Sequence, residues 1–269
     1  MDLLGQLLAN VDLERTIAVF FLVLARFAPL VFLAPFFAAQ SLPPSARMGL
    51  TAALSFLVFP AALEAAGPLP GSGAGLALLL GREALVGALL GFLVAIPFRA
   101  LEAGGRLIDS ARGANMAEVL AAPTEVRSSP LGAFLLLLGV VLFLAVDGHL
   151  LVIQAVGGSY RTLPLGAPIG ADAPRELTAL AIHLGSRFFL VAAGLAAPVL
   201  AAVVLVDLSL GLAGRLSPQL PLYFLGLPAK ALGGVALLLL ALPLVVVAIG
   251  GLFRLALRAV DAALRALGA

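Results

Sequence analysis

The apolar run LGAFLLLLGVVLFLAV occupies residues 131–146 and contains no charged side chain. A second run, VALLLLALPLVVVAI, occupies residues 235–249. Both runs are continuous, so they lack the alternation of apolar and polar residues that a strand of a membrane β-barrel requires. Because a chain in lipid must satisfy its backbone polar groups internally, continuous apolar runs of this kind predict membrane-spanning helices. We therefore expect an all-α fold.

The whole chain has the same apolar character as these two runs. Of its 269 residues, 62% are hydrophobic and 11% are charged, and the mean hydropathy is +1.18. Soluble domains carry about a quarter charged residues and are about half apolar. A water-soluble fold of this length could not cover so much apolar surface. The composition predicts a polytopic integral membrane protein, with residues 1–269 forming a single membrane-embedded domain.

A membrane span needs about 20 apolar residues, and on that measure the chain holds about six long, partly broken apolar helices. The fifth would be about 55 Å long, against about 30 Å of hydrocarbon, so we expect a bend at Pro198 or two shorter helices. Glycines and prolines predict loops at 67–73 and 157–166. The charge distribution does not specify the orientation in the membrane. The expected spans are 15–37, 46–66, 76–100, 130–156, 177–213 and 229–260.

A polar interruption separates the third and fourth runs, at residues 99–130. Four of its charges recur at spacings of three and four residues, so they share one helical face and can pair: Arg99, Glu102, Arg106 and Asp109. Two interpretations stay open for this segment. It is either a solvated loop with an amphipathic start, or a loop that gates a pore or contacts a partner.

Several ionisable residues lie within the apolar runs, where such groups are costly and mark function or assembly. Arg26 has three interpretations: a buried ion pair, a contact with another subunit, or a position near the membrane interface. Asp207 precedes Arg215 by eight residues, which places both on a similar helical face. Asp147 and His149 predict either a proton relay or a polar cap where a helix leaves the membrane.

The composition also excludes several kinds of chemistry. The chain has no cysteine, two histidines and a single lysine, Lys230. These counts exclude disulfides and Cys-ligated metals, make a dedicated metal site unexpected, and give no basic patch for nucleic acid. The glycine-rich string 71–75 lacks the lysine of a phosphate-binding loop. We expect no cofactor, no metal and no enzymatic activity.

Four stretches of the chain resemble the FliR/SctT family of type III secretion export-gate subunits. Their order and spacing extend over nearly the whole sequence. The string IDSARGANM at 108–116 and the SPLG that follows at 129–132 resemble the injectisome branch, SctT, more than the flagellar branch, FliR. The four stretches are Arg26 to Pro60 with APFF at 34–37 and LPPSAR at 42–47, then 103–132, then DGH at 147–149 with SYRTLPLG at 159–166, and lastly 197–230.

The resemblance implies an SctR-like part at about 1–176 and an SctS-like helical hairpin with an amphipathic tail at about 177–269, its turn at 215–230. It also implies a hetero-oligomer in the bacterial inner membrane, part of it above the membrane plane. The implied partners are SctR-like (FliP-like) and SctS-like (FliQ-like) subunits and an SctU-like (FlhB-like) switch protein. Together they would form a closed entry portal for unfolded export substrates.

The resemblance further assigns roles to individual residues. A lumenal plug loop is implied at Arg112, Gly113, Ala114, Asn115 and Met116, where glycine supplies flexibility and methionine adapts its shape to close a pore. A second set is expected to contact neighbouring subunits or to be buried charges: Arg26, Asp207, Arg215, Gln219 and Lys230.

Two other classes of protein remain as alternatives. A secondary transporter or small-solute channel also has broken helices and intramembrane charges, but it predicts an inverted repeat. The polar segment 99–130 has no counterpart in the other half of the chain. An intramembrane enzyme would need Asp147, His149 and His183 to converge. Co-purification separates these classes, because an export-gate subunit should be isolated with several small membrane partners.

Overall fold

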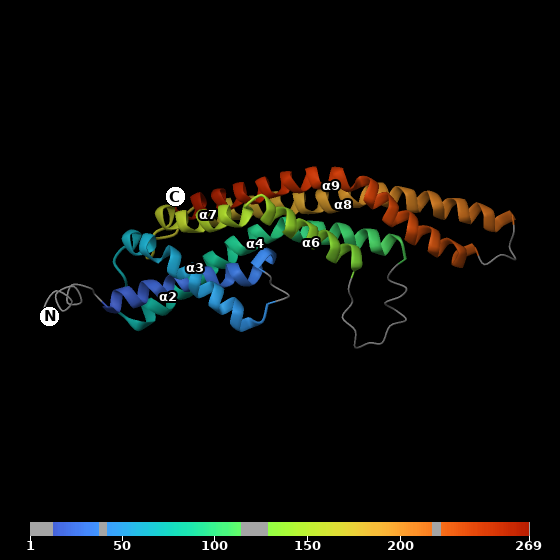
Figure 1. Ribbon diagram of the computed structural model, residues 1–269. Coiled ribbons are helices and arrows are strands. Elements are labelled where there is room, and N and C mark those ends of the chain that lie inside the picture. The colour runs from blue at the N-terminus through green and yellow to red at the C-terminus, as the bar shows by residue number, and fades with distance from the viewer. Residues whose placement is uncertain (1–12, 38–41, 114–128, 217–221, 269) are drawn as a thin grey trace. The chain divides into compact units, whose positions relative to one another are not determined.

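The computed structural model describes residues 13–37, 42–113, 129–216 and 222–268 (Figure 1). Throughout these residues the regular structure is helical, with no strand. The elements in chain order are α2 (Leu13–Leu33), the 3-10 turn η1 (Pro35–Phe37), α3 (Pro44–Ala65), α4 (Gly73–Ala111), α6 (Pro130–Ala145), α7 (Gly148–Thr162), α8 (Ala173–Leu216) and α9 (Leu222–Gly268).

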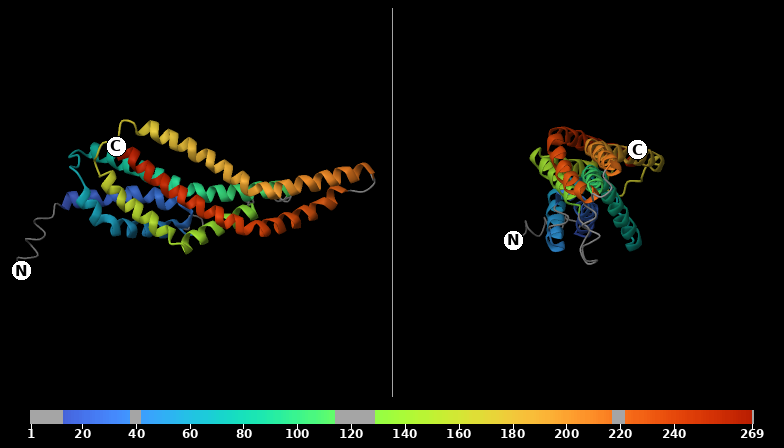
Figure 2. Two further views of the ribbon diagram at one scale, coloured as in Figure 1. Left: turned by 90° about the horizontal axis from the view of Figure 1, so that it is seen from above. Right: turned by 90° about the vertical axis from the view of Figure 1, so that its right-hand side faces the viewer.

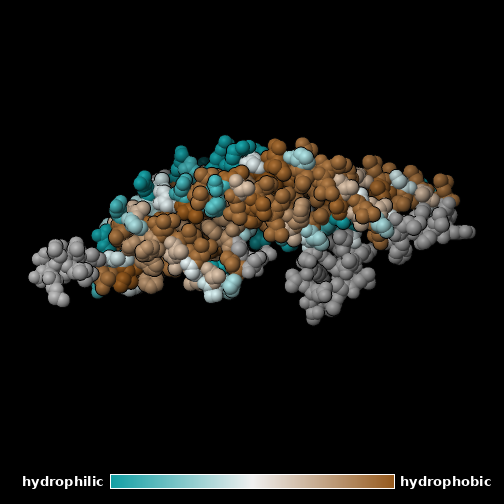
Figure 3. Space-filling model, viewed as in Figure 1, coloured by the Kyte–Doolittle hydropathy of each residue, from teal (hydrophilic) through white to brown (hydrophobic). Residues whose placement is uncertain are grey.

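Most of these helices are long and apolar enough to cross a membrane. Within the described residues five helices meet that criterion, and six segments do so if α6 and α7 form one broken span. Apolar side chains cover much of the surface of the long helices in the space-filling view (Figure 3). The all-α, polytopic fold that the sequence predicts is therefore confirmed.

The chain divides into two compact units, and several helices contribute to both. The first unit comprises Met1–Ala95, Phe143–Ile182 and Leu255–Ala269, and the second comprises Ile96–Leu142 and His183–Arg254. Figure 2 shows the same helices from two further directions. The expected boundary at about residue 176, between an SctR-like and an SctS-like part, stays a prediction.

In the first unit α2 lies beside α3 and crosses α4 closely (Figure 1). A Cβ atom on Gly87 would lie 1.9 Å from the carbonyl oxygen of Arg26, and one on Gly91 would lie 2.9 Å from Cα of Leu30. Glycines four residues apart on one helix face allow two membrane helices to approach at backbone distance. Any larger residue at Gly87 would push α2 and α4 apart.

The fourth apolar run differs from the expectation of one span at 130–156. The axes of α6 and α7 are bent by 72° at a short break. Asp147 lies in the break in the left-handed conformation, at φ 56°, and its carbonyl oxygen accepts a hydrogen bond from the Leu150 amide at 3.0 Å. A Cβ atom on Gly148 would lie 2.3 Å from the Phe143 ring, so glycine is required at this position.

The predicted loop over residues 157–166 is wrong in its first part. Helix α7 continues through Gly157 and Gly158 to Thr162. Two adjacent glycines disfavour a helix in isolation, but tertiary packing overrides that preference. Helix α7 packs against α3, and the Cβ position of Gly157 is 3.7 Å from the Val58 side chain.

The last two helices are longer than the sequence suggested. Helix α8 has 44 residues and passes through Pro198 without ending, so the alternative of two shorter helices is wrong. Helix α9 has 47 residues and contains Pro228 and Pro243. The expected amphipathic tail forms its last turns, where Arg265 pairs with Asp261 at 2.7 Å. Prolines are tolerated inside membrane helices because neighbouring groups satisfy the freed backbone carbonyls.

Candidate functional site

A buried ion pair connects three helices of the first unit. Arg26 of α2 donates from Nε to Oε2 of Glu83 on α4 at 2.6 Å, and both side chains are fully buried. Its Nη1 donates to Oγ of Ser159 at 2.8 Å and its Nη2 donates to the Leu163 carbonyl oxygen at 3.3 Å. The guanidinium carbon also lies 4.1 Å from the centre of the Tyr160 ring.

Three kinds of interaction compensate for burying the positive charge of Arg26. It has a carboxylate, two neutral hydrogen-bond acceptors and the face of an aromatic ring, which attracts a cation. Of the three interpretations left open for Arg26, the buried pair describes its position. Sequence reasoning missed its partner Glu83, although an acidic residue inside the apolar run 76–100 was a visible signal. The pair fixes α2, α4 and α7 to one another.

A second buried carboxylate, Asp109, lies in the second unit at the end of α4. Its Oδ2 accepts hydrogen bonds from Oγ of Ser129 at 2.6 Å and from the Leu131 amide at 2.8 Å. Its Oδ1 accepts a bond from Nη1 of Arg112 at 3.1 Å. The side chain is nearly inaccessible, with 2% of the residue exposed. Asp109 therefore joins the end of α4 to the beginning of α6.

The first turn of α6 is built to receive this carboxylate. Ser129 precedes the helix and its Oγ accepts a hydrogen bond from the Gly132 amide at 3.0 Å, while Pro130 occupies the first helical position. Serine as the N-cap and proline next to it are a favoured helix start. A negative charge beside the amide groups of a helix N-terminus is also stabilised by the helix dipole.

Glycines bring α4 close to the helices around its end. A Cβ atom on Gly105 would lie 2.5 Å from the Leu131 carbonyl oxygen, and one on Gly234 of α9 would lie 2.4 Å from Cδ of Arg112. Gly113 has φ +77°, a left-handed conformation that favours glycine where a helix ends. The residues just before position 114 are thus held by hydrogen bonds and by close packing.

The predicted plug residues are only partly described by the structure. Arg112 and Gly113 have the contacts given above, whereas Ala114, Asn115 and Met116 lie outside the described residues. The charged face predicted on 99–109 does form ion pairs, since Arg99 and Arg106 bind Glu102 at 2.8 and 2.6 Å. Asp109 was expected on that face and instead binds Arg112 and the start of α6.

The remaining predicted contact residues lie near the junction of α8 and α9. Asp207 was expected to share a face with Arg215, but its ion-pair partner is Lys230. A Cβ atom on Gly226 would lie 2.3 Å from Cδ1 of Leu210, so the two helices approach closely beside this pair. The Arg215 side chain is exposed. Gln219 lies outside the described residues.

The pair of Asp207 and Lys230 makes a specific assembly prediction. Lys230→Glu places two carboxylates together and should weaken the junction of α8 and α9 by about 1 kcal/mol, because Asp207 is half exposed and solvent screens the pair. We expect less of the variant to co-purify with partner membrane subunits. The exchanged pair Asp207→Lys with Lys230→Glu should restore co-purification. If the exchange fails to do so, Lys230 acts on a neighbouring subunit instead.

The two residues of the candidate proton relay, Asp147 and His149, lie at the break between α6 and α7. Asp147 is exposed, and His149 is half-buried with no partner for its Nδ1 atom among the described residues. His183, which the enzyme hypothesis adds to them, has an exposed side chain on α8. Asp147 occupies the bend itself without a side-chain hydrogen bond to the start of α7, and both interpretations of these residues stay predictions.

Comparisons with known proteins match nearly the whole chain. Residues 17–256 match the family model described as bacterial export proteins, family 1. The flagellar biosynthetic protein FliR of Escherichia coli strain K12 is 28% identical over 227 residues, which cover 84% of this chain and 85% of that protein. The Yop proteins translocation protein T of Yersinia pestis is 31% identical over 220 residues, covering 81% and 84%. The surface presentation of antigens protein SpaR of Shigella flexneri is 30% identical over 209 residues, covering 77% and 78%.

Proposed function

Because the chain belongs to the bacterial export proteins, family 1, we propose that it is a subunit of the closed entry portal through which unfolded proteins leave the cytoplasm. As a member of this family it is a component of a type III export apparatus and a multi-pass membrane protein. Its relatives are named for flagellar biosynthesis and for Yop translocation. The preference for the injectisome branch therefore stays a prediction.

The observation that carries this proposal is the uncovered apolar surface of the two longest helices. Helix α8 has 44 residues and would be about 66 Å long, roughly twice the hydrocarbon thickness of a bilayer. Only 22% of the residues in the apolar stretch of α8, and the same share in α9, are buried. Lipid cannot cover the whole length of such a helix. Apolar surface beyond the bilayer needs other protein subunits to cover it.

This surface supports a hetero-oligomer in the bacterial inner membrane with SctR-like, SctS-like and SctU-like partners. The contacts between Asp207 and Lys230 and between Leu210 and Gly226 support a hairpin of α8 and α9. We propose that this hairpin takes the place of an SctS-like subunit in the assembly. Arg215 and Gln219, near its turn, would contact neighbouring subunits.

We further propose that residues 112–116 form the plug that seals the portal when no substrate is passing. The buried carboxylate of Asp109 supports this role, because it holds the helix ends on both sides of the segment in place. A seal must return to the same closed position after each substrate. Fixed ends restrict where the segment can go and so favour that return.

Co-purification from bacterial membranes tests the proposed function. The affinity-tagged full-length chain, produced together with the other export-apparatus membrane proteins of its own genome, should be isolated in a stable complex with several of them. A tagged, unrelated polytopic protein from the same membranes is the control. If the chain is isolated as a monodisperse monomer, without partner proteins, it is not a portal subunit.

A further inference from the structure

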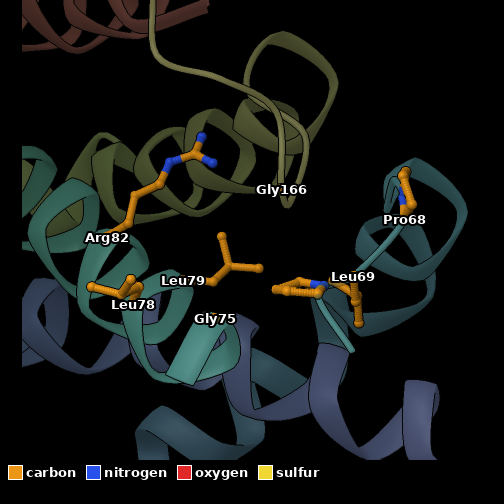
Figure 4. A pocket seen from close by; sticks show the side chains of 8 residues that line it. Pro68, Leu69, Gly75, Leu78, Leu79, Arg82 and Gly166 are labelled. Carbon is orange, nitrogen blue, oxygen red and sulfur yellow. The ribbon is translucent and has the colours of Figure 1, made fainter. Parts of the chain in front are cut away.

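An open pocket of about 460 Å³ lies in the first unit, where the segment after α3 passes the first turns of α4. Figure 4 shows Arg82 and Leu79 extending from α4 toward the loop that contains Gly166. Among the described residues that line this pocket, Arg82 supplies the only charged side chain. The others are prolines, leucines and glycines, among them Pro68, Pro70 and Leu78.

The guanidinium of Arg82 has donors that the described part of the chain does not use. Its Nε and Nη2 atoms are buried and have no hydrogen-bond partner among the described residues. The neighbouring carboxylate of Glu83 binds Arg26 through its Oε2 atom at 2.6 Å, and its Oε1 atom has no hydrogen-bond partner among the described residues. Two arginines and one glutamate leave one positive charge in excess. A cation with unpaired donors in an apolar setting is costly, so an anion from outside the chain would stabilise it.

The surface around Arg82 has the apolar character that lipid acyl chains require. Leu78 and Leu85 lie four residues before and three residues after Arg82, so all three share one face of α4. These leucines are 78% and 74% exposed. A Cβ atom on Gly81 would meet open space, so this face of the helix is not covered. A cationic group thus lies between two exposed apolar residues on a membrane helix.

The depth of Arg82 is compatible with the headgroup region of a bilayer. Helix α4 has 39 residues and would be about 58 Å long, so part of it must lie outside about 30 Å of hydrocarbon. Arg82 is nine residues after the start of α4, about 14 Å along its axis. The rest of the helix is long enough to cross the hydrocarbon beyond this point.

We propose that this pocket binds the phosphate of an anionic phospholipid, with Arg82 as its hydrogen-bonding partner and the acyl chains along Leu78 and Leu85. A guanidinium presents two parallel N–H donors that match two phosphate oxygens. The apolar walls favour a lipid over a free phosphate ion, because the ion offers nothing to cover the leucines. The lipid would act as a structural ligand of the first unit, and this role does not depend on the proposed export function.

Native mass spectrometry of the full-length chain in detergent tests this proposal by counting bound lipids. The probes are phosphatidylglycerol, the zwitterionic phosphatidylcholine and inorganic phosphate. We expect one phosphatidylglycerol to bind about 10-fold more tightly than phosphatidylcholine. Both lipids have a phosphate that the guanidinium can bind, but the choline ammonium of phosphatidylcholine would place a second cation beside Arg82. Arg82→Gln should remove this preference, and Arg82→Lys should keep part of it. Arg106→Gln on the same helix is the matched control and should bind lipid as the original chain does.

Three outcomes would overturn the proposal. One is equal binding of the two lipids by the original chain. Another is an undiminished preference in Arg82→Gln. The third is competition by inorganic phosphate at the concentration at which the lipid binds, which would indicate a site for a free anion. If Arg82→Gln does not fold, the comparison of the two lipids on the original chain and on Arg82→Lys still decides the question.

Discussion

Glu83→Gln is expected to lower the apparent melting temperature of the detergent-solubilised protein by about 10 °C. The change keeps the shape of the side chain but removes its charge, which leaves Arg26 buried without a counter-ion. Breaking a buried ion pair by removing one partner typically costs about 3–5 kcal/mol. In a chain of this size each kcal/mol corresponds to roughly 2–4 °C. Size-exclusion chromatography after heating, with the folded peak as the readout, measures the shift.

The cost of this substitution should be unusually large because Arg82 is adjacent. The neutral glutamine would leave two arginines near each other with no carboxylate between them. Ser159 and the Leu163 carbonyl would still accept hydrogen bonds from Arg26. They are neutral, so they satisfy the donors of Arg26 without balancing its charge.

Two further variants show whether the buried charge causes the effect. Glu102→Gln removes a carboxylate from the same helix, but its arginine partners are exposed, so we expect a loss below about 1 kcal/mol. The double variant Arg26→Met with Glu83→Leu replaces both charges by apolar groups and should recover much of the stability. Equal melting temperatures for Glu83→Gln and Glu102→Gln would contradict the structural role of the pair.

The fold class could be predicted from apolar runs alone, whereas the partners of individual charges could not. The run at 131–146 indicates a membrane helix whatever surrounds it, because only lipid or protein can cover it. Arg26 stands out by its position in a run, but its partner Glu83 is 57 residues away and no periodicity connects the two. The same limit explains why the expected partner of Asp207 was wrong. A helical spacing suggested Arg215, and the structure pairs Asp207 with Lys230 on the next helix.

Local sequence signals such as glycines also predicted the wrong helix bounds where tertiary packing decides the conformation. Residues 157–162 have two glycines and were expected in a loop, yet α7 continues through them beside Val58. The span expected at 130–156 ran past the break at Asp147, although the polar-cap interpretation of Asp147 and His149 placed a helix end there and Gly148 is a signal for a close approach. Asp109 was recognised only as one charge on a helical face. Its contact with Ser129 connects positions 20 residues apart, and no helical spacing in the sequence links the two.

Deleting residues 112–116 is expected to raise ion leakage through an assembled portal, and Asp109→Ala should raise it to a smaller extent. The deletion removes the proposed plug itself. The substitution leaves the plug residues present but removes the acceptor of three hydrogen bonds, from Ser129, Leu131 and Arg112. Hydrogen bonds to a charged group contribute about 1.5–3 kcal/mol each. A net loss of about 2 kcal/mol in the closed state would change the ratio of closed to open portals roughly 30-fold.

The measurement is the membrane potential of bacteria that produce the chain together with its partner subunits, followed with a potential-sensitive dye. Asp261→Asn is the matched control, because it removes an aspartate whose ion pair with Arg265 is exposed. Each variant must first co-purify with the partners as well as the original chain does, so that leakage reports on the seal and not on failed assembly.

The order of the variants distinguishes a plug from a simple linker. If 112–116 seals the portal and Asp109 positions it, leakage should fall in the order deletion, Asp109→Ala, Asp261→Asn. Leakage that is unchanged in the deletion would mean that other subunits form the seal. A leak in Asp109→Ala without one in the deletion would show that the carboxylate supports the helix packing of α4 and α6 alone, because only the deletion removes the sealing residues while leaving Asp109 in place.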